Sequence, residues 1–397
     1  MRKLFFLIAV AAICGATPLV NAQSDVLTPI VRNLGGDVIP IAVKSSSQSI
    51  QDELTRAFGL HGAYALTSED KADFVFSVEP SNTSLVTLEI LSGNPAQSLY
   101  KIQVGGENYA DAVARAADVA VAKTSGLKGI FAGELAFVGQ RGGTTDLYLS
   151  DLLFQNVRKL TNDNAQCTRP SISPDGKTVL YTSYCKNGFP DIYKIDLATG
   201  RREAFLSFNG VNTGATFSPD GRRVAMILSG TGNAELYTIS SACKDMQRLT
   251  KNKTIESDPA WSPDGKRIVF ASDTLGKPHL FLIDANGGEM HQIPSISTYS
   301  AEPAWNPVDA NVIATTIMQG TAFEVAVYNL ATNENHVVSE GIGDAIEPTW
   351  TSDGRHLIYT ERTPNHRRLV LLDTKTGHKA YLSSQDLDTS AAGYAYP

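Results

Sequence analysis

One short stretch repeats through the second half of the chain and constrains the fold more than any other feature. Three of its versions read "SISPDGKTVLYTS", "TFSPDGRRVAMIL" and "AWSPDGKRIVFAS". The first residue of the "SPDG" segment, or its counterpart, recurs at intervals of 45, 44, 44 and 45 residues, at Ser173, Ser218, Ser262, Asn306 and Thr351. A period of about 40 to 45 residues is typical of a β-propeller, in which each blade is a sheet of four antiparallel strands.

Each repeat has the residue pattern of one blade. Ser, Pro, Asp and Gly are preferred at successive positions of a type I turn, so "SPDG" predicts a hairpin between a first strand such as "PAW" and a second such as "RIVFAS". Apolar alternation predicts a third strand in "HLFLID" and a short fourth strand in "EMHQI". We interpret the carboxylates of these turns as solvent-facing turn residues rather than metal ligands: Asp175, Asp220, Asp264 and Asp353.

The number of blades follows from the two ends of the repeat region. Residues 133–161 supply a second, a third and a fourth strand, but no first strand. The position one repeat beyond Thr351 is Tyr396, in "AGYAYP", so the missing strand is expected at the C-terminus. Closing the ring in this way removes two unpaired strand edges from water. The sequence therefore predicts a mainly β fold with a six-bladed propeller over residues 132–397, closed by the C-terminal strand.

The preceding segment has a different pattern. "VIPIAV" predicts a buried strand, and "SSSQSIQDELTRAFG" predicts a helix with serine caps that stops at Gly59. "ADFVFSVEPSNTSLVTLEIL" predicts a hairpin, "SLYKIQV" a further strand, and "NYADAVARAADVAVAKTSG" an alanine-rich helix that ends at Gly126. We expect a small mixed α/β domain over residues 23–131.

The first 22 residues have the features of a signal peptide. Arg2 and Lys3 precede an apolar run, and the segment ends in "VNA", which offers small residues for signal peptidase. Cys14 would suit a lipoprotein signal, but Ile13 before it is too bulky for lipidation. No later run reaches the roughly 18 apolar residues of a membrane span. We therefore expect cleavage after residue 22, export from the cytoplasm and no direct membrane insertion.

The charge balance narrows the choice of partners. Removing Arg2 and Lys3 takes the formal charge from −7 to −9. This balance argues against a nucleic-acid or anionic-membrane partner. Cys167 and Cys185 flank one turn almost symmetrically, so a disulfide between them and three free thiols, with Cys243, are both compatible with the sequence.

The residues offer little for catalysis. The sequence has no metalloprotease, nucleophile-elbow or phosphate-loop motif, and no close cysteine pair. Its seven histidines occupy no fixed blade position, so we interpret them as surface or packing residues. We expect neither an enzyme nor a bound cofactor or metal.

One periodic position points to binding. The residues that precede the "PAW" strand are Arg169, Gly214, Asp258, Glu302 and Glu347. Because the first strand of a blade is the innermost, these side chains should lie at one mouth of the central channel. Three carboxylates there repel one another unless a cationic or hydrogen-bonding group satisfies them, which suggests a binding site. The alternative is three acids in well-hydrated channel water.

The signal peptide, the α/β domain, the blades and the junction "KTSGLKGIFAGELAFV" together resemble the TolB family of the Tol-Pal system. The resemblance implies a non-enzymatic, monomeric scaffold in the periplasm. Such a scaffold links the inner-membrane Tol complex to the peptidoglycan-associated lipoprotein, and so supports outer-membrane integrity and invagination during cell division. It implies that the lipoprotein docks at Arg169, Asp258, Glu302 and Glu347.

The resemblance also places a TolA-like inner-membrane protein at the mature N-terminus, "QSDVLTPIVRNLGGDVIPIAV", which departs from the family's usual "RPIGVVPF". The turn that begins at Asn306, "NPVDAN", lacks the glycine of the other turns. The alternative is an exported propeller enzyme of lyase or peptidase type, or a propeller that binds a small ligand or metal at its acidic mouth.

Overall fold

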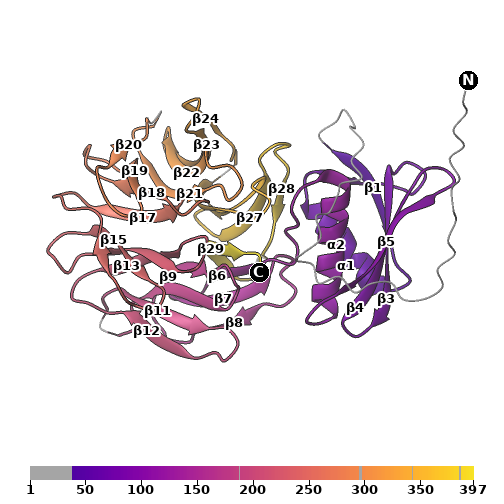
Figure 1. Ribbon diagram of the computed structural model, residues 1–397, viewed down its shortest axis with the longest axis horizontal. Helices are drawn as coiled ribbons and strands as arrows, with labels where there is room; N and C mark the ends of the chain where they lie inside the picture. Colours follow the sequence, from indigo (N-terminus) through magenta and orange to yellow (C-terminus); the bar gives the residue numbers. More distant parts are fainter. Residues whose placement is uncertain (1–37, 187, 295–296, 342, 384–385) are drawn as a thin grey trace, which may run out of the picture.

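Two packed parts make up the structure (Figure 1). A computed structural model describes residues 38–397 except 187, 295–296, 342 and 384–385. The expected signal peptide and residues 23–37 of the expected TolA-binding segment lie outside the described residues, whereas the end of that segment forms the first strand of the α/β part. An α/β part comes first in the chain, and a propeller follows. The mainly β architecture with six blades and a small α/β domain confirms the fold class predicted from the repeat.

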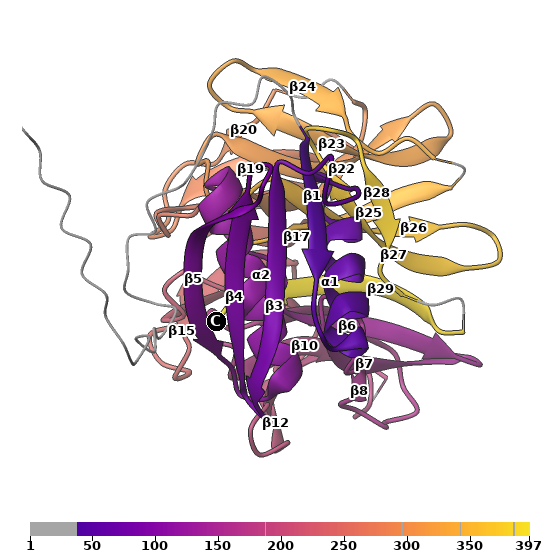
Figure 2. The same ribbon diagram turned by 90° about the vertical axis from the view of Figure 1, so that its right-hand side faces the viewer.

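The α/β part is one sheet with two helices on one face. Its elements are β1 (Ile39–Lys44), α1 (Gln48–Leu60), β2 (Tyr64–Leu66), β3 (Phe74–Asn82), β4 (Leu85–Ser92), β5 (Gln97–Gly105) and α2 (Tyr109–Ser125). The sheet order is β2-β1-β3-β4-β5, in which β1 runs parallel to β2 and β3 and the other pairs are antiparallel. Both helices lie between the sheet and the propeller, and Figure 2 shows the sheet from its outer side.

The helix ends follow local chemistry in one case and packing in the other. At the start of α2, Asn108 accepts a hydrogen bond from the Asp111 amide (3.0 Å), and Gly126 ends the helix in the left-handed region. By contrast, α1 continues through Gly59 to Leu60, and Ser47 makes no capping bond with its side chain. The expected stop at Gly59 was wrong because Ile50, Leu54 and Phe58 are buried and hold the last turn in place. Among the described residues, neither helix is long and apolar enough to cross a membrane.

The propeller consists of six four-stranded sheets within the described ranges. The first is β29 (Asp388–Ala395), β6 (Glu134–Arg141), β7 (Thr144–Asp151) and β8 (Arg158–Lys159). The second is β9 (Cys167–Ile172), β10 (Thr178–Ser183), β11 (Asp191–Asp196) and β12 (Arg202–Leu206). The third is β13 (Asn212–Phe217), β14 (Arg223–Leu228), β15 (Glu235–Ser240) and β16 (Gln247–Arg248).

The remaining three blades follow the same order. The fourth is β17 (Glu256–Trp261), β18 (Arg267–Ser272), β19 (His279–Asp284) and β20 (His291–Gln292). The fifth is β21 (Ser300–Trp305), β22 (Val312–Gln319), β23 (Ala322–Asn329) and β24 (Glu334–Val337). The sixth is β25 (Asp344–Trp350), β26 (His356–Arg362), β27 (Arg367–Asp373) and β28 (Lys379–Tyr381).

The ring closes as the repeat predicted. β29 pairs antiparallel with β6, with Ser390 opposite Val138 and Tyr394 opposite Leu135. The inner strands contact one another around the ring, including β29 with β9 and with β25. The two ends of the repeat region therefore build one blade together, and no blade of the described chain lacks its inner strand.

The turn aspartates are more closely bound than expected. In the "SPDG" turn at Ser173, the hydroxyl donates to Asp175 Oδ1 (2.6 Å) and accepts the Thr178 amide (2.9 Å). Asp175, Asp220 and Asp264 remain exposed, in agreement with a turn role. Asp353 is the exception, because it is buried against the α/β domain. Its expected solvent-facing position was wrong, and its new partners are described below.

Two tryptophans form hydrogen bonds between neighbouring blades. Trp261 Nε1 donates to the Thr216 carbonyl of the preceding blade (3.1 Å), and Trp350 Nε1 donates to the Ala304 carbonyl (3.1 Å). The core of the α/β domain also continues into the propeller. One cluster of buried apolar side chains joins Phe58 and Phe131 to Ile358 of the sixth blade.

Candidate functional site

A cavity of about 610 Å³ opens along the propeller axis. The inner strands form its wall, with prolines and aromatic side chains such as Trp305 and Tyr394. All four charged residues selected from the sequence line it: Arg169, Asp258, Glu302 and Glu347. The structure thus brings together residues that lie in four different blades.

A shared backbone conformation places these residues. Each inner strand has a register irregularity in its middle. The residue at that point has φ between 50° and 66°, in the left-handed region; these residues are Arg169, Gly214, Asp258, Glu302, Glu347 and Ala391. Non-glycine residues adopt this region rarely and at a cost. We call these six residues the channel ring.

The two glutamates of the channel ring bind neighbouring backbone. Glu302 Oε2 accepts hydrogen bonds from the Thr316 hydroxyl (2.8 Å) and from the Glu347 amide of the next blade (2.9 Å). Glu347 Oε2 accepts the Thr360 hydroxyl (2.8 Å) and the Ala391 amide (2.9 Å) in the same way. Burial and the charge of Glu302 raise the pKa of Glu347. These carboxylates therefore join consecutive blades, a role that the sequence did not indicate.

The third acid has a cationic partner within the ring. Arg169 forms an ion pair with Asp258, two blades away, while Ser257 donates to Asp258 Oδ2 (2.8 Å). Gly214 stands between them in the ring and has no side chain to obstruct the pair. The Arg169 side chain is still 39% exposed, whereas that of Asp258 is 8% exposed. The protein itself thus supplies the cationic group that the three acids were expected to need.

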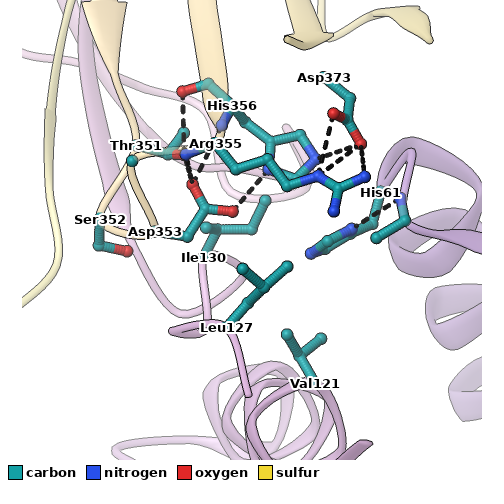
Figure 3. Close-up of polar contacts among 12 residues, drawn as sticks. His61, Val121, Leu127, Ile130, Thr351, Ser352, Asp353, Arg355, His356 and Asp373 are labelled. Carbon is teal, nitrogen blue, oxygen red and sulfur yellow. Dashed lines mark hydrogen bonds and ion pairs between the residues drawn. The ribbon is translucent and has the colours of Figure 1, made fainter. Parts of the chain in front are cut away.

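A second polar cluster lies where the α/β domain meets the propeller (Figure 3). The rings of His61 and His356 are in edge contact, with centroids 4.3 Å apart and planes at 75°. His356 Nδ1 lies 2.6 Å from Asp353 Oδ2, and Arg355 binds Asp373 through Nε (2.9 Å) and Nη2 (2.7 Å). Both histidines are fully buried. No pattern in the sequence pointed to this cluster, because its histidines lie almost 300 residues apart.

The cluster contains donors that could hold a metal. One ligand atom from each of His61, Asp353 and His356 lies within 4.8 Å of the others. Zinc uses these residue types, and His356 has a carboxylate on its other nitrogen, as ligating histidines commonly do. However, a cation already lies beside them, because the Arg355 guanidinium reaches Asp373, whose Oδ2 is 3.7 Å from His356 Nε2. The charges favour a closed interdomain contact over an ion site.

The cysteines are free thiols in this structure. Arg202 Nη2 lies 2.9 Å from Cys185 Sγ and donates to it. Cys167 is buried, and burial raises its pKa to about 12. Of the two states that the sequence left open, the structure has the reduced one.

Together these features define a class: a six-bladed propeller with a charged ring in its channel and an α/β domain packed against one blade. The chain belongs to the TolB family, because the family model described as "TolB beta propeller domain" matches residues 121–395. This match confirms the resemblance seen in the sequence.

Curated relatives and a solved structure agree with this assignment. The Tol-Pal system protein TolB of Francisella tularensis subsp. holarctica is 28% identical over 199 residues, which cover 46% of this chain and 45% of the relative. A TolB homolog of Chlorobaculum tepidum is 31% identical over 127 residues, which cover 32% and 29%. The chain thus spans less than half the length of these relatives. The crystal structure of TolB from Acinetobacter baumannii has the same fold, with a TM-score of 0.81 at 20% identity over 91% of this chain and 98% of that one.

Proposed function

We propose that this protein is the periplasmic scaffold of a Tol-Pal system and not an enzyme. It would link the inner-membrane Tol complex to the peptidoglycan-associated lipoprotein, and so support outer-membrane integrity and invagination during cell division. Membership of the TolB family supports this proposal, and the Francisella relative is named as a Tol-Pal system protein. The observation that carries it is the channel cavity, where Arg169 remains 39% exposed and available to a partner.

The structure suggests a division of roles within the proposed binding site. Arg169 and Asp258 pair through their side chains, so a charged group of the partner could take the place of either residue in the ion pair. Glu302 and Glu347 are already engaged by backbone amides of the next blade. We therefore propose that Arg169 and Asp258 contact the lipoprotein, while the two glutamates shape the mouth. The TolA-like partner is proposed to bind the mature N-terminus, residues 23–43.

The test removes the charge of each residue and keeps a polar side chain in its place. In Arg169→Gln and Asp258→Asn, we expect retention of the lipoprotein from an envelope extract to fall roughly tenfold, as for a charged residue at an interface centre. Asp264→Asn is the matched control, because Asp264 is an exposed acid in the neighbouring turn. Far-ultraviolet circular dichroism should show the same fold for all three variants.

Two outcomes would contradict the proposal. One is equal retention of the lipoprotein by the wild type and both channel variants. The other is failure of the wild type to retain any lipoprotein, together with stoichiometric calcium in the purified protein, which would favour a ligand- or metal-binding propeller. Deleting residues 23–37 should abolish binding of the TolA-like protein and leave the lipoprotein bound.

A further inference from the structure

The contact between His61 and His356 joins the α/β domain to the propeller. His61 directly follows α1 of the α/β domain, and His356 begins β26 of the propeller. Both side chains have no exposed surface. Whatever changes the charge of this pair therefore acts directly on the interface between the two parts.

The hydrogen bonds indicate that His61 is neutral. The Ala63 amide donates to His61 Nδ1 (3.3 Å), so this nitrogen carries a lone pair and the ring proton lies on Nε2. His61 Nε2 has no partner among the described residues. A second proton would have to enter at Nδ1, where it would face the Ala63 N–H and break that hydrogen bond.

The carboxylates that face His61 offset only part of the cost of an added charge. The groups around it are, from the propeller, His356, Asp353, Arg355 and Asp373, and from its own domain the ring of Tyr64. Asp353 is engaged by His356, and Asp373 by Arg355. The guanidinium would repel an imidazolium. Burial, followed by the charge of His356, lowers the pKa of His61 to about 3.

We propose that His61 and His356 form a proton-sensitive latch, which holds the α/β domain on the propeller at neutral pH and releases it in mild acid. In the released state His61 is hydrated and titrates near its ordinary value of 6.5. Because the docked state excludes the proton, lower pH favours release. The docking constant should fall about 50-fold between pH 6.5 and pH 4.5. This inference does not depend on the proposed partners.

Release would also affect the channel. The Ser352 hydroxyl donates to the Gly129 carbonyl (2.6 Å), and the Tyr394 hydroxyl donates to the Ile130 carbonyl (2.9 Å). Both side chains line the channel cavity, while Gly129 and Ile130 belong to the segment that connects the two parts. A domain that swings about this segment would pull on one wall of the cavity.

Small-angle X-ray scattering of the full chain at pH 7.5 and pH 4.5 tests the latch. We expect the wild type to gain an extended population at pH 4.5, while circular dichroism shows that secondary structure is retained. His61→Phe keeps a ring among Tyr64 and Phe131 but cannot bind a proton, so it should stay compact at both pH values. His61→Lys should be extended already at pH 7.5.

A second histidine in the same interface provides the control. His378 Nε2 lies 3.0 Å from the Gly59 carbonyl, but His378 is exposed. His378→Gln should therefore expand at the same pH as the wild type. A wild type that stays compact at pH 4.5, or a His61→Phe variant that expands with it, would overturn the latch.

Discussion

Glu235 and Glu256 are two buried carboxyl groups at the boundary between the third and fourth blades. Burial and the charge of Glu235 raise the pKa of Glu256 to about 7. Glu235 Oε2 has no donor among the described residues, so a proton on Glu256 is the donor that it lacks. At the preceding blade boundary, Asn212 Nδ2 donates to Asp191 Oδ1 (3.1 Å). The amide group supplies the donor there, so this pair needs no added proton.

We predict that Glu256→Gln stabilises the protein in mild alkali. The pKa of Glu256 is higher in the folded chain than its ordinary value of 4.5, so folding is penalised increasingly from pH 4.5 to about 7 and constantly above that. At pH 8 the variant should gain about 1 to 3 kcal/mol in free energy of unfolding, and at pH 4.5 close to nothing. Urea unfolding at both pH values measures this difference. Asn212→Asp should instead lower the free energy of unfolding at pH 8. An equal gain for Glu256→Gln at pH 8 and pH 4.5 would show that ionisation of Glu256 does not cause it.

A second prediction concerns the thiols. Burial raises the pKa of Cys185, but hydrogen bonds from Ser183, Tyr193 and Arg202 outweigh it and leave the pKa below its ordinary value. Burial raises the pKa of Cys243. A short pulse of iodoacetamide followed by peptide mass spectrometry should therefore label Cys185 roughly tenfold faster than Cys243. Arg202→Met should remove most of that difference; equal rates in the wild type would rule out a stabilised thiolate.

At the scale of elements, β29 holds the ring together. Its pairing with β6 supplies the inner strand of the first blade, and Tyr396 just beyond it donates to Asp118 Oδ2 of α2 (3.0 Å). Deleting residues 390–397 should lower the melting temperature by about 10 °C or more, because it exposes the edge of β6 and removes the inner strand of the first blade. Deleting Pro397 alone is the control and should have little effect. An unchanged melting temperature after the longer deletion would mean that the blade is stable without its inner strand.

Elements were predictable where their signal is local and repeated. The turn residues and the strand spacing specify the blades, and the same spacing finds the closing strand at Tyr396. The short β2 has no such signal, since it exists only because β1 offers a parallel edge. The position of Arg169 was predictable, but its ion pair with Asp258 was not, because it depends on the shape of the ring. His61 and His356 could not be paired, since the orientation of one domain on another leaves no periodic trace in the sequence.

At the scale of the whole molecule, the continuous core predicts cooperative unfolding. The apolar cluster that contains Phe58, Phe131 and Ile358 crosses the boundary between the two parts, and Asp118 accepts amides from Ile130 and Phe131 (both 2.8 Å). Calorimetry at pH 7.5 should therefore give one transition for both parts. At pH 4.5 the proton-sensitive latch predicts two. Two transitions at pH 7.5 would show that the interface contributes little to stability.

The blade that β6 and β29 share also bears on how the chain is made. Gln140 pairs with Asp388, roughly 250 residues later, so the contact that completes the ring forms only after every other blade has been synthesised. Contacts between such distant residues form slowly. Until then the edge of β6 is unpaired, and other copies can join it. Between the synthesis of β6 and that of β29, a chaperone that covers the unpaired edge would therefore reduce association between copies most strongly.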